Sequence, residues 1–163
     1  FILTLIAAYS FKDFKRLLIL ITAFTIGHCI TLALSSFDII RVKSNWIEFL
    51  IPCTIVITAL DNILFKGKRP YQVYLALFFG LIHGMGFANT ARMMLAKEQR
   101  ITVPLLGFNI GLELGQIAMV LIILIIFTII TKFTKLNQRE WLLITSSAAG
   151  AVALQMALER MPF

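Results

Sequence analysis

Charged residues are scarce in this sequence. Asp, Glu, Lys and Arg make up 14% of its 163 residues, whereas apolar residues make up 60%. Ordinary soluble domains carry about 25% charged residues. This composition excludes a water-soluble globular domain.

Cysteine and histidine are rare too, with two of each in the chain. Cys29 and Cys53 lie in separate apolar stretches without CxxC spacing, which is typical of small core residues and does not indicate a disulfide framework. The sequence contains no CxxCH haem motif, HExxH zinc motif, GxSxG nucleophile motif or phosphate-binding loop. We therefore expect no enzyme activity and no permanently bound cofactor.

Acidic residues are fewer than basic ones, 8 against 15, which gives a net charge of +7. In a soluble protein such an excess would suggest binding to nucleic acid. Here the basic residues form short clusters between long apolar runs, as in the loops of membrane proteins. We therefore expect the lipid bilayer as a partner, and no nucleic acid.

Long apolar runs dominate the rest of the chain. A helix needs about 20 residues to cross a hydrocarbon core of about 30 Å. The short apolar stretch at 1–9 predicts that the chain begins inside a helix. The segments long enough to cross are 17–36, 46–65, 71–91, 101–131 and 141–160. The predicted fold is all-α, a single transmembrane helical bundle over residues 1–163 with six helices, of which the first is truncated.

The distribution of Lys and Arg between loops predicts an orientation. Nine of these residues fall in the loops 10–16, 66–70 and 132–140, and six fall on the opposite side. Cytoplasmic loops are enriched in Lys and Arg. We therefore expect these three loops in the cytoplasm and both ends of the chain on the outer side.

Ionisable residues inside the predicted spans are few, and they are candidates for function because charge at membrane depth costs several kcal/mol. With a rise of about 1.5 Å per residue, His28, His83, Asn109 and Glu113 fall in one layer near the middle of the membrane. Glu48 falls near the outer interface, where water relieves much of the cost.

The fifth predicted span carries two further patterns. Asn109, Glu113 and Gln116 follow one another at i, i+4 and i+7, so they form a polar stripe on one helix face. Glycines recur every four residues along 107–115, and others lie in 80–86 around His83. Such glycines predict close packing against neighbouring helices.

Imidazole and carboxylate groups at one depth suggest a metal. They suit a borderline divalent ion such as nickel, cobalt or zinc better than magnesium or calcium, which prefer oxygen ligands. A single histidine could equally serve as a hydrogen-bonding contact that only holds helices together. Two histidines and Glu113 in the same layer favour a site through which a metal ion passes.

Five segments resemble the successive motifs of the HupE/UreJ family of membrane proteins. They are FTIGHCITLAL at 24–34, WIEF at 46–49, ALDNIL at 59–64, FGLIHGMGFAN at 79–89 and FNIGLELGQ at 108–116. The resemblance implies a six-helix protein of the bacterial inner membrane that is associated with nickel supply to hydrogenase or urease, as a nickel or cobalt permease. It also implies that the functional polar residues are His28, Glu48, Asn62, His83, Asn109, Glu113 and Gln116. The family's Gly-x-Asp-His motif of the first helix has no counterpart in residues 1–9.

Two other functions stay open at this stage. The same polar residues could belong to a membrane accessory protein that does not transport, such as a metal sensor or an assembly subunit with a protein partner or a second copy. An intramembrane enzyme or haem protein would use His28 and His83 differently. The permease hypothesis accounts best for the shared depth of the polar groups.

Overall fold

The computed structural model describes residues 1–65, 69–95, 102–134 and 136–162, with the backbone alone at 88–95 and 102. Helices make up nearly all of these ranges, which contain no strand, so the all-α prediction is confirmed. In chain order the elements are α1 (Ile2–Ile6), the 3-10 turn η1 (Phe11–Asp13), α2 (Phe14–Ser36), α3 (Ser44–Leu64), α4 (Gln72–Leu95), α5 (Thr102–Phe133) and α6 (Gln138–Glu159).

Each predicted span corresponds to one of the five long helices, and the partial helix at 1–9 corresponds to α1. Among the described residues, four helices are long and apolar enough to cross a membrane: Phe11–Ser36, Ser44–Leu64, Val103–Phe133 and Gln138–Glu159. The apolar part of α4, Gln72–Phe87, is shorter. The length and apolar composition of these helices are those of a multi-pass membrane protein.

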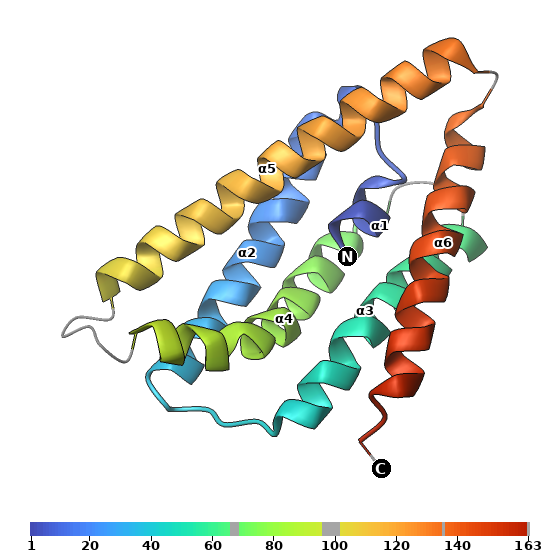
Figure 1. The fold of residues 1–163 in the computed structure, drawn as a ribbon. Coiled ribbons are helices and arrows are strands. Elements are labelled where there is room, and N and C mark those ends of the chain that lie inside the picture. Colours follow the sequence, from blue (N-terminus) through green and yellow to red (C-terminus); the bar gives the residue numbers. More distant parts are fainter. Residues whose placement is uncertain (66–68, 96–101, 135, 163) are drawn as a thin grey trace.

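Two helix pairs build the bundle, as Figure 1 shows. Helix α2 packs along α4, and α3 packs along α6. Contacts between α3 and α4 join the two pairs, while α5 lies along α2. The short α1 lies among the long helices (Figure 1) and contacts α3, α5 and α6, and its buried residues are Thr4, Leu5 and Ile6.

Glycines bring the backbones of α2 and α4 into direct contact. A Cβ atom on Gly80 would overlap the carbonyl oxygen of Phe24, and one on Gly84 would overlap the carbonyl oxygen of His28. Only glycine lets the two helices approach this closely. The contact confirms the packing predicted for 80–86, and it holds His83 beside the turn of α2 that carries His28.

The glycines of α5 behave differently. A Cβ atom on Gly107, Gly111 or Gly115 would meet no atom of the described chain within 4 Å. The prediction that this stripe packs against another helix is therefore wrong within the described residues. Helix α5 instead contacts α2 through the opposite face, which carries its polar side chains Glu113 and Gln116.

Candidate functional site

A cavity of about 530 Å³ lies where the five helices α1 to α5 meet. Its wall is mostly apolar, and His28, His83 and Gln116 supply its polar side chains. The lining residues are Phe1, Ile2, Leu3, Phe24, His28, Ile51, His83, Gly86, Phe87, Leu112, Gln116, Met119 and Ile123. The structure thus brings three of the sequence-predicted site residues together around one space.

His28 is buried without a hydrogen bond. Its exposed fraction is 5%, and neither ring nitrogen has a partner among the described residues. Leaving a buried polar group unsatisfied costs about 1–3 kcal/mol. Because the described residues do not use this imidazole as a donor or acceptor, either ring nitrogen could contact a ligand in the cavity.

His83 reaches the same cavity from α4. Its Nε2 lies 3.0 Å from the hydroxyl oxygen of Thr54 on α3. The Phe24 ring packs on both imidazoles, with centroid distances of 5.2 Å to His83 and 6.2 Å to His28. The two histidines therefore flank one aromatic side chain and share an apolar surrounding.

Gln116 is the member of the α5 polar stripe that lines the cavity. It is 5% exposed, and its Oε1 accepts a hydrogen bond of 3.0 Å from the Thr25 hydroxyl of α2. This bond fixes the amide against the helix that carries His28. An amide oxygen with a second lone pair is a possible ligand for a cation.

Glu113 and Asn109 lie beside the cavity. The Oε1 of Glu113 accepts a hydrogen bond of 2.8 Å from the Thr22 hydroxyl, and Glu113 is absent from the lining. The buried Oδ1 of Asn109 has no hydrogen-bond partner among the described residues. Glu113 and Gln116 thus both contact α2, and only Gln116 lines the cavity with the two histidines.

The polar groups that line the cavity are two imidazoles and one amide. Within the described ranges, no three His, Cys, Asp or Glu side chains come together as a ligand set. Two imidazoles and an amide leave several coordination positions to water or to other groups. An incomplete set of this kind suits weak, exchangeable binding of a borderline divalent ion.

These helices and their motifs match a known protein family. The family model described as HupE / UreJ protein matches residues 1–160. The chain belongs to the HupE/UreJ family. Searches of curated proteins and of solved structures gave no match. The resemblance seen in the sequence is confirmed, and this HupE/UreJ protein is a multi-pass membrane protein.

Asn62 and Glu48, the other two residues that the HupE/UreJ resemblance implies, lie away from the cavity lining. Asn62 is 5% exposed, and its Nδ2 donates to the Thr4 carbonyl at 2.7 Å and to the Ser146 hydroxyl at 3.1 Å. It therefore joins α3 to α1 and α6. Glu48 is exposed near the start of α3 and accepts a hydrogen bond of 2.9 Å from Ser44.

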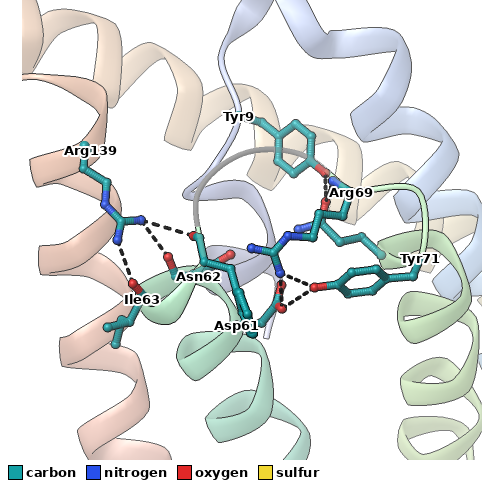
Figure 2. A network of polar contacts seen from close by, with 9 residues as sticks. Tyr9, Asp61, Asn62, Ile63, Arg69, Tyr71 and Arg139 are labelled. Carbon is teal, nitrogen blue, oxygen red and sulfur yellow. Dashed lines mark hydrogen bonds and ion pairs between the residues drawn. The ribbon is translucent and has the colours of Figure 1, made fainter.

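A second polar region of this HupE/UreJ protein lies at the end of α3 and the start of α4, and Figure 2 shows it. Asp61 forms an ion pair of 2.7 Å with Arg69 and accepts a hydrogen bond of 2.6 Å from Tyr71. Arg69 also donates to the Tyr71 hydroxyl. The hydrogen bond to Tyr71 and the nearby charge of Asp61 raise the pKa of the Arg69 guanidinium, so Arg69 stays charged beside Asp61.

Three further hydrogen bonds belong to this region, which we call the end network (Tyr9, Asp61, Asn62, Arg69, Tyr71, Gln72 and Arg139). Arg139 donates to the carbonyls of Asn62 at 2.8 Å and Ile63 at 2.6 Å, at the last turn of α3 (Figure 2). The Tyr9 hydroxyl donates to Gln72 at 2.6 Å. Neither this network nor the Thr54 contact to His83 is evident from the sequence, because both join helices whose relative rotation the apolar pattern leaves open.

Proposed function

We propose that this HupE/UreJ protein is a permease of the bacterial inner membrane that passes a divalent transition-metal ion, nickel or cobalt, through the cavity. One observation carries the proposal. His28 is buried with no partner for either ring nitrogen in the described part of the chain, and it lines a cavity that a second imidazole also lines. A buried group that the fold leaves unsatisfied is best explained by a ligand.

The ligand chemistry follows from the groups at the cavity. His28 and His83 would supply imidazole nitrogens, which borderline divalent metals accept readily. Gln116 would supply an amide oxygen. Glu113, held by Thr22 beside the cavity, would offset part of the positive charge of an ion in these apolar surroundings, since a carboxylate nearby favours a cation. Asn109 would support the same stripe.

Transit rather than permanent storage fits the same geometry. A permanent metal site usually has a closed set of ligands, and the cavity offers no such set among the described residues. Its described lining also contains no Lys or Arg that would repel an ion. We further propose that the basic loops 10–16, 66–70 and 132–140 face the cytoplasm, which puts both ends of the chain outside.

Uptake by the full-length protein in liposomes tests the proposal. His28→Ala and His83→Ala should each lower the initial rate of nickel or cobalt uptake by at least about tenfold, because each removes a metal ligand. Gln155→Ala is the matched control, since Gln155 on α6 is exposed and bonds only to Glu159. Uptake that both histidine variants leave unchanged would overturn the site.

The accessory function is an outcome of the same experiment. If the purified protein binds nickel and the histidine variants do not, but no vesicle takes up metal, the protein is a sensor or assembly subunit. Recovery of a partner protein in fixed proportion would then identify the assembly that it serves.

A further inference from the structure

Thr54, on α3, contacts His83, one of the two histidines that line the cavity. Its side chain is 2% exposed. The hydroxyl oxygen lies 2.7 Å from the carbonyl oxygen of Ile51 and 3.0 Å from Nε2 of His83. One hydroxyl therefore makes two contacts, one within its own helix and one to α4.

The number of hydrogens decides the direction of both contacts. A threonine hydroxyl has one hydrogen to donate, and a carbonyl oxygen can only accept. At 2.7 Å the two oxygens need a hydrogen between them, so Thr54 donates to Ile51. The hydroxyl is left with lone pairs, and in the contact of 3.0 Å the Nε2 of His83 must be the donor.

We propose that Thr54 is a positioning residue that holds neutral His83 with its proton on Nε2, so that Nδ1 carries the free lone pair and binds the metal ion. This inference rests on the proposed function, since it names the ligand atom of the same site. It agrees with a general feature of metal-binding histidines, whose second ring N–H is held by a hydrogen-bond acceptor that sets the tautomer and the ring orientation.

Neighbouring groups hold this arrangement in place. The rings of Phe1 and Phe24 pack on the His83 imidazole at 5.3 Å and 5.2 Å between centroids. These rings hold the plane of the imidazole, and a turn of the ring within that plane would lose the bond to Thr54.

His28 contrasts with His83 within the same cavity. Neither of its nitrogens has a partner among the described residues, so nothing there selects a tautomer. The two histidines thus have separate roles. His83 presents one preset nitrogen, whereas His28 can present either nitrogen as an ion moves past it.

Nitrogen NMR of the full-length protein tests the tautomer without any metal. With ¹⁵N-labelled histidine at mildly alkaline pH, His83 in the wild type should show a protonated Nε2 and an unprotonated Nδ1. Thr54→Val keeps the shape but removes the acceptor, so the His83 signals should shift toward a mixture of tautomers. Thr54→Ser should restore the wild-type signals.

Nickel titration of the same samples tests the consequence for binding. Thr54→Val should weaken nickel binding by about tenfold or more, as loss of an outer-shell partner typically does, and Thr54→Ser should bind like the wild type. Thr58→Val is the matched control, because its hydroxyl bonds only to the backbone and does not touch a histidine.

Different results would overturn the role of Thr54 and the proposed function. A wild-type His83 with its proton on Nδ1 overturns the inference, and this measurement needs no variant that could misfold. Nickel binding that Thr54→Val leaves unchanged overturns only the role of Thr54. A wild-type protein that binds no nickel overturns the proposed function and the role of Thr54 together.

Discussion

The cavity and the end network are two polar regions of one apolar bundle, and they differ in whether their polar groups have partners. In the end network, Asp61, Arg69 and Arg139 each have one or more partners. In the cavity, His28 has none among the described residues. The difference indicates that the first region holds the helices together, whereas the second keeps donor atoms free for a ligand.

The two regions also differ in what their polar groups do for stability. A hydrogen bond made inside a protein contributes about 1 kcal/mol net, and a buried group without a partner costs more than that. Removing a member of the end network should therefore lower stability. Removing the imidazole of His28 should not lower stability.

The largest expected effect comes from Asn62→Leu. This change removes both bonds by which Asn62 joins α3 to α1 and α6 and leaves the Thr4 carbonyl without that donor. We expect the free energy of unfolding in detergent to fall by about 2 kcal/mol, while the folded fraction binds nickel as before. Nickel binding that is lost at unchanged stability would instead assign Asn62 to the metal site.

A smaller, pH-dependent effect is expected at Tyr9, whose hydroxyl donates to Gln72. Burial raises the pKa of Tyr9 above its ordinary value of 10.0. The folded state therefore keeps this proton where the unfolded state loses it, so the stabilisation is complete below pH 10 and declines as pH rises further. Tyr9→Phe should cost about 1 kcal/mol at neutral pH and should flatten the alkaline decline. Parallel alkaline melting curves for both proteins would contradict this expectation.

The smallest expected effect on stability comes from His28→Leu, although it abolishes metal binding under the proposed function. Leucine fills a similar volume and removes a buried polar group that has no partner among the described residues. The free energy of unfolding should stay the same or rise by up to about 1 kcal/mol. Chemical denaturation of this variant and of Asn62→Leu under the same conditions would measure the difference directly. A loss of stability as large as that of Asn62→Leu would contradict the distinction between the two regions.

Much of the fold could be predicted from the sequence, because apolar runs and charge clusters determine which segments can cross a membrane. The start of α2 could not be located this way, since it depends on hydrogen bonds between Ser10 and Asp13 just before the apolar run. Helix rise also placed His28 and His83 in one layer, and both line one cavity. Their meeting at one cavity could not be predicted from helix rise, since it depends on how each helix is rotated about its axis.

The polar stripe of α5 shows the same limit at the candidate site. Spacing correctly placed Glu113 and Gln116 on one helix face. It could not show that Gln116 lines the cavity while Glu113 bonds to Thr22. That distinction depends on the crossing of α2 and α5, to which residues on both helices contribute.

The glycine contact between α2 and α4 has a consequence for how this protein can change over evolutionary time. Main-chain atoms, rather than interlocking side chains, determine how far apart the two histidine-bearing turns stand. Substitutions on the lipid-facing surface can therefore accumulate without altering that spacing. Gly80 and Gly84 cannot be substituted in this way, because even one added methyl group would force the two turns apart.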